Sequence, residues 1–501
     1  MTLVRDAGVQ LVAQFTVPYR GTWKSVAVNQ ITPDAVYDSS NVFIRKGKLR
    51  ERPGLKLLNS TVFDSSIVGG AMAVTPTDKV LLAISKNKLY TLKSTDAVWQ
   101  QDTTAPTAVF ATGTTPVDVC FLETASQHVA IIAAGNMRLK RWIQESGVSE
   151  VIAVTGTTPI AISVCTAARR IIALIEPHTL VWTATLTYDN YTALATAKLA
   201  QTNDKGICVR ALSNLSFVVY KERSIYLARA QSGSDAFAFG FSEPIIAEGP
   251  AGLHSVVIVN GVHFYMTRNG RVALFDGTGY PRWIADGLWI HLQGDIDPVY
   301  ANMIFGIFDY RLNIVVFYYP KVGDNGQLKG ALVINLPLEG SGVTSFSFFL
   351  AYFSIPCSYG YEMRFADSID RTVLFATAPL QSVNLDEDTK QDITTNFTAS
   401  FQTGLQPLPD MMHYYLSIEA FLERANGNGS VKVFPVVSDV LENETGTVIE
   451  SDNNIIDLNN NPLREYIGFT ARTRFFGLKY QWTSDNKVRY AGTQVYGRVI
   501  A

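Results

Sequence analysis

The sequence predicts an all-β protein: a β-propeller of six to seven blades followed by a C-terminal β-sandwich or jelly-roll domain. Three observations predict this fold. Short β-branched and aromatic runs alternate with turns that contain Asn and Gly. These hairpin units recur at roughly 40–55 residues, the usual length of a propeller blade. The pattern then changes at a polar stretch near residue 390. Two or three β-sandwiches in tandem are the alternative, because their strands also come at short, regular intervals.

The first region, residues 1–60, is predicted to be an N-terminal arm that ends in an opening hairpin. Asn41–Arg45 reads as a strand, Lys46-Gly47-Lys48 as a tight turn and Leu49–Arg52 as the returning strand. Strand alternation would place several basic side chains on one face, where they could contact a neighbouring subunit or another partner. These candidate contact residues are Arg45, Lys46, Lys48, Arg50 and Arg52. The alternative, which we favour because no aromatic platform accompanies the charges, is a solvated hairpin whose charges prevent aggregation.

The second region, residues 61–385, is predicted to be the propeller. Ser255–Val259, Val262–Met266 and Arg271–Phe275 read as three short strands. Asn260-Gly261 between the first two is the dipeptide that type I′ hairpin turns prefer. The same pattern recurs, for example at residues 80–92, 129–142, 171–182 and 217–227. One such sheet cannot bury both of its faces, whereas a ring of stacked sheets can.

The third region, residues 390–501, is predicted to be a separate β-sandwich or jelly roll. A polar linker, formed by Asn384–Asp388 and Lys390–Asp392, marks its beginning. Thr398–Thr403 and Val431–Val437 read as strands, and two further strands close the chain around Ser484–Asn486.

Composition and cysteine usage exclude several classes of protein. The 501 residues are 47% hydrophobic and 17% charged, with a formal net charge of −2, so the overall charge does not favour binding to nucleic acid or an anionic membrane. The four cysteines form no Cys-x-x-Cys pair and are expected to be small buried residues of a protein made in a reducing compartment. They are Cys120, Cys165, Cys208 and Cys357. We expect no signal peptide, because the first residues contain no apolar segment, and no membrane insertion.

No catalytic, metal-binding or cofactor-binding site is predicted. His254 and His263 lie on one predicted hairpin, where they could face each other, but no Cys or carboxylate joins them at a metal-ligand spacing, so structural roles are expected. Asp295 and Asp297 read as parts of a solvated turn. No nucleophile elbow, P-loop or dinucleotide-binding motif occurs. A propeller could still bind or cleave carbohydrate, and Trp283 and Trp289, which flank Asp286, are the local candidates for that alternative.

The two ends of the chain resemble one family. The run from Asn41 to Leu55, with its Arg52-Pro-Gly-Leu55 end, resembles the opening of bacteriophage tail nozzle (tail-hub) proteins of short-tailed phages. Arg472-Thr-Arg474 before Phe476–Tyr480, and the run Gly492–Arg498, are similar to the C-terminal pattern of the same proteins. The resemblance covers about the first 60 and last 40 residues, and the repetitive middle is compatible with it.

This resemblance implies a structural virion protein, made in the host cytoplasm and assembled into the phage tail. It implies a propeller, a homohexameric ring at the end of the DNA-ejection channel, and no active site. The implied partners are other copies of the chain, the tail adaptor and other tail proteins, and genomic DNA that passes through the lumen without specific binding. The alternative functions are a carbohydrate-binding or carbohydrate-cleaving propeller, such as a phage depolymerase or lectin, and a protein-binding scaffold. The scaffold is disfavoured by the absence of a Gly-His/Trp-Asp repeat.

Overall fold

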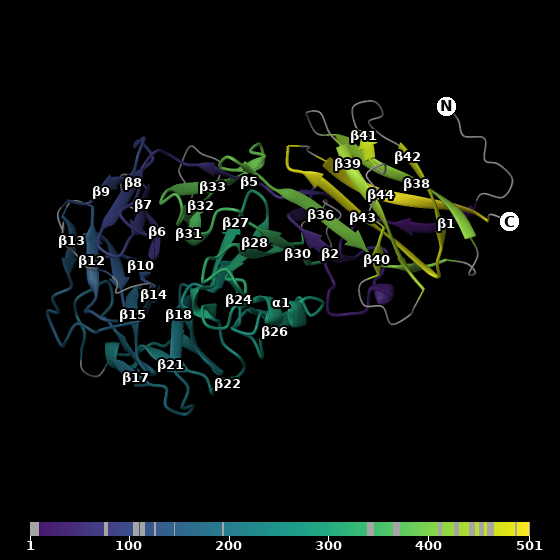
Figure 1. The fold of residues 1–501 in the computed structure, drawn as a ribbon. Coiled ribbons are helices and arrows are strands. Elements are labelled where there is room, and N and C mark those ends of the chain that lie inside the picture. The colour runs from purple at the N-terminus through teal and green to yellow at the C-terminus, as the bar shows by residue number, and fades with distance from the viewer. Residues whose placement is uncertain are drawn as a thin grey trace.

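Nearly all regular structure in the chain is β-strand. The computed structural model describes residues 10–74, 79–103, 110, 116–124, 127–144, 146–192, 195–337, 345–363, 371–408, 413–424, 430–439, 446–449, 455–457, 465–485 and 488–499. Among them, α-helix occurs in α1 (Trp289–Asp295) and short 3-10 turns occur at three places. The strands form a propeller and, beside it, a two-sheet sandwich (Figure 1).

Seven sheets form the propeller, so the predicted propeller is confirmed with seven blades. Blade one comprises β6 (Gly69–Val74), β7 (Lys79–Ile84), β8 (Leu89–Lys93) and β9 (Gln100–Gln101), and blade two β10 (Asp118–Glu123), β11 (His128–Ala133), β12 (Lys140–Ile143) and β13 (Gly147–Glu150). Blade three comprises β14 (Ser163–Ala167), β15 (Arg170–Ile175), β16 (Thr179–Trp182) and β17 (Thr196–Lys198). Blade four comprises β18 (Gly206–Ser213), β19 (Ser216–Lys221), β20 (Ser224–Ala230), β21 (Phe239–Phe241) and β22 (Ile245–Ile246).

The next two blades follow the same order. Blade five comprises β23 (Val256–Val259), β24 (Val262–Met266), β25 (Val272–Phe275) and β26 (Arg282–Ile284), and blade six β27 (Phe305–Asp309), β28 (Ile314–Tyr319), β29 (Gly330–Asn335) and β30 (Ser347–Tyr352). Every residue of β28 and β29 is buried. Neighbouring blades cover both faces of each sheet, which explains why these strands read as continuous apolar runs and not as alternating ones.

Blade seven is completed by a strand from the N-terminal region. Its own strands are β31 (Cys357–Met363), β32 (Arg371–Ala376) and β33 (Ser382–Asp386). β5 (Gly54–Leu57) pairs antiparallel with β33, and β34 (Gln391–Asp392) and β35 (Thr395–Asn396) follow on its other side. The innermost strand β31 packs beside β6 of blade one, so the ring is closed. The N-terminal segment therefore joins the last blade of the propeller.

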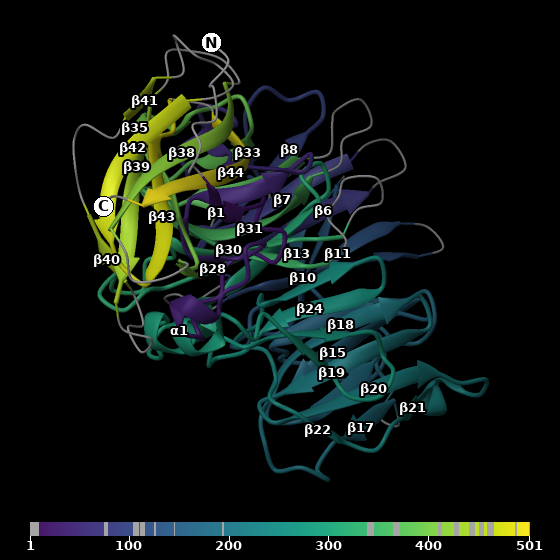
Figure 2. The same ribbon diagram turned by 90° about the vertical axis from the view of Figure 1, so that its right-hand side faces the viewer.

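The sandwich is also built from both ends of the chain. One sheet contains β3 (Val42–Arg45), β4 (Lys48–Glu51), β44 (Val488–Val499), β38 (His413–Arg424) and β42 (Glu465–Arg472), with β1 (Gln10–Phe15) on β44. The other contains β2 (Val36–Ser40), β36 (Thr398–Thr403), β43 (Phe475–Thr483), β39 (Ser430–Ser438) and β40 (Thr447–Val448), with β37 (Gln406–Pro407) and β41 (Ile455–Asp457) at its margins. The sandwich lies against one side of the propeller (Figure 2).

One hydrophobic core runs from the sandwich into the propeller. In the sandwich, the ring of Phe401 stacks on Tyr480 with centroids 4.9 Å apart and meets Tyr490 at 4.8 Å. The same continuous cluster of buried side chains includes Phe305 and Tyr318 of blade six, whose rings stack at 4.8 Å. The two units therefore share buried apolar surface, which disfavours independent motion.

These arrangements correct the predicted domain limits. The described part of the predicted arm, residues 10–60, is not separate: β1 to β4 belong to the sandwich and β5 belongs to blade seven. Residues 1–9 lie outside the described residues. Residues 391–396 also belong to blade seven, so the C-terminal part of the sandwich begins at β36. Periodicity along the chain reveals a strand and its buried side, but it does not reveal which distant strand will pair with it. Tandem β-sandwiches, the alternative fold, are excluded by the closed ring of seven sheets.

Candidate functional site

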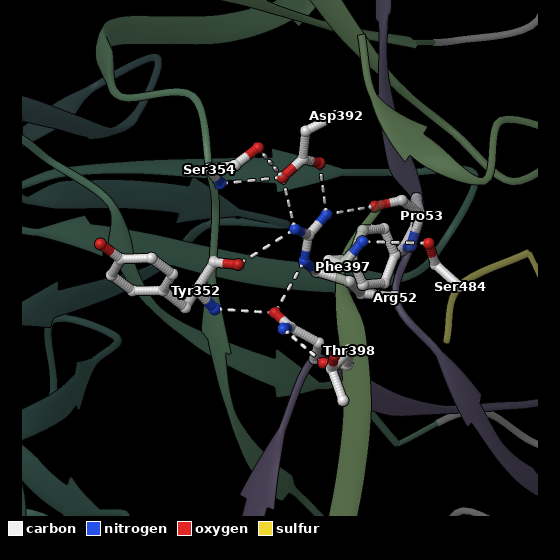
Figure 3. A network of polar contacts seen from close by, with 9 residues as sticks. Arg52, Pro53, Tyr352, Ser354, Asp392, Phe397, Thr398 and Ser484 are labelled. Carbon is white, nitrogen blue, oxygen red and sulfur yellow. Dashed lines mark hydrogen bonds and ion pairs between the residues drawn. The ribbon is translucent and has the colours of Figure 1, made fainter. Parts of the chain in front are cut away.

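Arg52, one of the five predicted contact residues, is buried where the sandwich meets the propeller (Figure 3). Its two terminal nitrogens bind the two carboxylate oxygens of Asp392 at 2.8 and 2.7 Å. The same nitrogens donate to the carbonyl oxygens of Pro53 at 2.9 Å and Tyr352 at 3.0 Å, and Nε donates to Oδ1 of Asn41 at 2.9 Å. All five N–H groups of the guanidinium therefore have a partner.

Aromatic rings enclose the same guanidinium. Its central carbon lies 3.9 Å from the ring centroid of Phe353 and 3.8 Å from that of Phe397. The side chains of Arg52 and Asp392 are 1% and 0% exposed, so the ion pair is shielded from water. Asn41 comes from the sandwich, whereas Asp392 comes from blade seven. Arg52 thus joins the two units in the manner of a structural clamp, and it is not available to an external partner.

Two more of the predicted contact residues face inward. Arg45 binds Glu387 at 2.9 Å and donates to the carbonyl oxygen of Arg311 at 2.7 Å, and Arg50 approaches the other carboxylate oxygen of Glu387 at 3.6 Å. Lys46, at φ 51°, forms the hairpin turn and is the one exposed side chain among the five. Lys48 is partly buried on β4. Both interpretations of the basic hairpin therefore need correction, because its arginines bind other parts of the same chain.

A second polar cluster lies on the propeller axis. Arg210 of β18 reaches two blades away to Oδ2 of Asp118 at 2.7 Å, and its other terminal nitrogen donates to the carbonyl oxygen of Leu253 at 2.5 Å. Ser163 Oγ donates to the same carboxylate oxygen at 2.6 Å. The carboxylate raises the pKa of the Arg210 guanidinium above its usual range, despite the opposing effect of burial. The cluster ties the inner ends of blades two to five together.

His254 contacts two other blades beside this cluster. Its Nε2 donates to the carbonyl oxygen of Val117, on the opposite side of the ring, at 3.1 Å, and its ring lies 4.4 Å from that of Tyr359. Burial lowers the pKa of His254 to about 4, so the imidazole is neutral at pH 7. His263 has its own partners, the Tyr220 hydroxyl at 2.9 Å and the carbonyl oxygen of Ala211 at 2.9 Å. The two histidines therefore stabilise blade interfaces separately.

Asp118, Arg210 and His254 also line a cavity of about 530 Å³. All seven innermost strands line it. Its lining combines apolar side chains such as Met72, Phe121 and Ile258 with polar and charged ones, among them Arg210 and Glu362.

The remaining chemical candidates have structural partners. The guanidinium of Arg271 lies 5.2 Å from the ring of Trp283 and 4.7 Å from that of Trp289, so a cation already contacts both proposed sugar-binding rings. Asp286 between them is exposed. Asp295 binds Lys321 at 3.3 Å and accepts from the Tyr319 hydroxyl at 2.9 Å. Within the described part of the chain, no group of three His, Cys, Asp or Glu side chains is placed to hold a metal ion.

The cysteines are free and buried, as the sequence predicted. Cys120, Cys165 and Cys208 lie on the innermost strands of blades two, three and four. Burial raises the pKa of the Cys120 thiol to about 12 and that of Cys208 to about 12. A thiolate is the reactive form, so burial and the raised pKa both disfavour reaction of these thiols in the folded protein.

Sequence reasoning missed Asp118, Arg210, Glu387 and Asp392. A signal for Arg210 was present, because it is the single charge in β18, and a charge in such a strand needs a buried partner. The signal for Asp118 was weaker, because β10 also carries Glu123. For Asp392 and Glu387 no local signal exists, because both lie in a polar stretch that also reads as a solvated linker.

Comparison with known proteins finds structural likeness at low identity and low TM-score. No family model and no curated sequence matches the chain. Solved structures that match include BBS1N in complex with ARL6DN, at 10% identity and TM-score 0.42 over 69% of this chain and 99% of that chain. BamB from Moraxella catarrhalis matches at 10% identity and TM-score 0.36 over 66% and 99%, and the WD40 propeller domain of Doa1 at 12% identity and TM-score 0.41 over 67% and 98%. No helix among the residues that the structure describes is long and apolar enough to span a membrane.

Proposed function

We propose that this chain is a non-catalytic structural subunit of a bacteriophage tail, which assembles with other copies into the nozzle ring at the end of the DNA-ejection channel. The observation that carries the proposal is the position of Arg52. The Arg-Pro-Gly-Leu run that resembles nozzle proteins is the segment that clamps the sandwich and the propeller together. A motif that fixes two parts of one chain to each other favours a structural role for the protein.

The internal pairing of the arginines on the basic hairpin supports the same function. Arg45, Arg50 and Arg52 form ion pairs with Glu387 and Asp392 of the same chain. Affinity for DNA comes chiefly from Lys and Arg contacts to phosphates. A ring built from a chain of net charge −2, with these arginines paired internally, would let DNA slide through its lumen without binding.

The polar clusters also fit a scaffold better than an enzyme. Arg210 and Asp118 neutralise each other across the propeller axis. His254, which burial keeps neutral at pH 7, donates a hydrogen bond from one blade to another. Each group has a partner that stabilises the ring of blades, and general acid–base or nucleophilic catalysis needs such a group to be directed at a substrate.

Mass spectrometry and antibody labelling of purified phage particles that encode this chain test the proposal. We expect several copies per particle, labelled at the tip of the tail and absent from the capsid. A chain that is missing from washed, infectious particles, or that labels the capsid, would refute the assignment.

A further inference from the structure

Most of the strands at the start of the chain pair with strands more than 300 residues later. β1 and β4 pair with β44, β2 pairs with β36, and β5 pairs with β33. β3 and β4 form a local hairpin. We call residues 10–57, which contain β1 to β5, the strap. The strap runs from the sandwich, where β1 lies beside β44, to blade seven, where β5 lies beside β33 (Figure 1).

The strap also covers the outermost strand of blade six. Thr22 N donates to the carbonyl oxygen of Phe348 at 2.7 Å, and Asn41 N donates to that of Leu350 at 3.0 Å. Asn41 Oδ1 accepts a hydrogen bond from Tyr352 N at 2.8 Å. These residues of β30 lie at the edge of their sheet, where backbone groups without a partner would be open to other strands. The strap thus completes both sheets of the sandwich and the edges of blades six and seven.

The strap supplies core side chains as well as backbone partners. Its most buried side chains are no more than 2% exposed and include Phe15, Val42, Phe43, Leu49 and Leu55. All five belong to the hydrophobic cluster that the sandwich shares with blade six. Arg52 also lies in the strap, whereas Tyr352 and Asp392, which it binds, lie outside it. If the strap leaves, its apolar burial and the clamp are lost together.

Blades one to six are local structures by comparison. Each is formed by one continuous stretch of chain, for example residues 163–198 in blade three and 206–246 in blade four. Contacts between residues that are near in sequence form quickly, whereas a pairing that closes a very long loop must first lose much chain entropy. The blades can therefore form before the strap is placed, and they can persist after it has left.

Only a short connection separates the pairing of the strap in the sandwich from its pairing in blade seven. β4 ends at Glu51 and β5 begins at Gly54, so Arg52 and Pro53 alone connect them. Arg52 is fixed there by its two bonds to Asp392. Because so short a connection leaves no slack, β4 and β5 take up their positions together, once the sandwich and blade seven lie side by side.

We infer that the strap is a conformational latch, the last part of the chain to be placed on folding and the first to leave on unfolding. Its closure completes the sandwich and blade seven in one step, and its opening leaves blades two to five intact. An open strap exposes the edges of β30, β33, β36 and β44, and unpaired edges of this kind promote aggregation. The inference concerns a single copy of the chain and does not depend on the proposed ring.

Native-state hydrogen exchange of the full chain at low urea concentrations tests the latch. Mass spectrometry of peptic peptides follows residues 42–57 of the strap and residues 170–175 and 216–221 of blades three and four. In the wild type, β4 and β5 should report one common free energy of opening, smaller than that of the two blade peptides, because the strap opens before the blades. A strap that opens at a higher free energy than the blades would overturn the inference, as would different values for β4 and β5.

Two variants establish the order of opening. Arg52→Lys weakens contacts that are lost when the strap opens and stay lost when the blades open, so it should speed exchange of both by the same factor, about 30-fold. Arg170→Met is the matched control, because Arg170 of blade three binds Asp235, between two strands of blade four, at 2.6 Å. That ion pair survives while only the strap is open. The control should therefore speed exchange of the blade peptides about tenfold and leave the strap unchanged.

Each other pattern overturns the latch. Faster exchange of the strap in Arg170→Met would mean that the blades open with it or before it. An effect of Arg52→Lys on the strap alone would mean that the two regions open independently. If either variant fails to fold, pulse labelling of the wild-type chain during refolding decides the order. Blades two to five should then gain protection before the strap, and simultaneous protection would refute the inference.

Discussion

Replacement of Arg52 should destabilise the whole molecule, because the side chain holds together three segments that are far apart in sequence. In Arg52→Met, a side chain of similar length keeps much of the contact with Phe353 and Phe397 but removes all five N–H donors. The carboxylate of Asp392, 0% exposed, is then left buried without its counter-ion. Loss of one partner from a buried ion pair costs about 3–5 kcal/mol of unfolding free energy.

Three comparison variants separate the possible causes. Arg52→Lys keeps the charge but offers three donors on a flexible stem and cannot bind both carboxylate oxygens in a planar fork, so we expect a loss of about 2 kcal/mol. The double variant Arg52→Met/Asp392→Leu removes both charges and should recover at least about 1 kcal/mol relative to Arg52→Met. Arg20→Met breaks an exposed pair with Asp34, at 50% and 42% exposure, and should cost under about 1 kcal/mol.

The assay is urea unfolding followed by both tryptophan fluorescence and far-ultraviolet circular dichroism. We expect Arg52→Met to lower the unfolding midpoint in a single transition, because the clamp belongs to both units. A cost below about 1 kcal/mol, equal to that of the exposed pair, would refute the clamp. A transition that splits into two, with the propeller as stable as in the wild type, would refute its role in the ring of blades.

Three further predictions follow from other parts of the molecule. Gly54→Ala should lower the melting temperature by several degrees, because a Cβ at this position of β5 would lie 2.4 Å from the carbonyl oxygen of Gln391. Gly294→Ala is the neutral control, because a Cβ at position 294 meets nothing within 4 Å. Burial lowers the folded-state pKa of His254 to about 4, below its unfolded value, so the unfolded chain binds the proton more readily and stability should fall as pH drops from 6.5 toward 4. His254→Gln should make unfolding free energy less dependent on pH between 6.5 and 5, and an unchanged slope would contradict this. Finally, the pKa of the Cys120 thiol is raised to about 12, so Ellman's reagent at pH 8 should react with none of the four buried cysteines until urea unfolds the chain; fast reaction of the folded protein would contradict their burial.

The blades could be predicted because their hairpins are local. Asn260 and Gly261 both adopt positive φ, at 50° and 78°, and join two strands that pair directly, so the turn is evident in the sequence. Completion of blade seven could not be predicted in this way. β5 pairs with β33 more than 300 residues later, and four residues of apolar pattern do not specify so distant a partner.

The basic hairpin shows why the site was harder to predict than the fold. Arginines close to one another on a short hairpin usually indicate an exposed charged surface, because Arg is seldom buried unless it is paired. Here Arg45 and Arg50 share Glu387, and Arg52 pairs with Asp392 across 340 positions. The partners lie in a stretch that sequence alone assigns to a solvated linker. The sequence marked these charged residues as candidate contact residues. Whether their side chains point to solvent or to another part of the chain depends on the tertiary structure.

Electron microscopy of the purified chain tests the account most directly, since it reports the assembly and the internal arrangement of each copy together. The account predicts closed rings in which every copy shows a seven-bladed disc and a sandwich at one fixed angle. Separate copies whose two parts adopt variable angles would contradict both the ring and the Arg52 clamp.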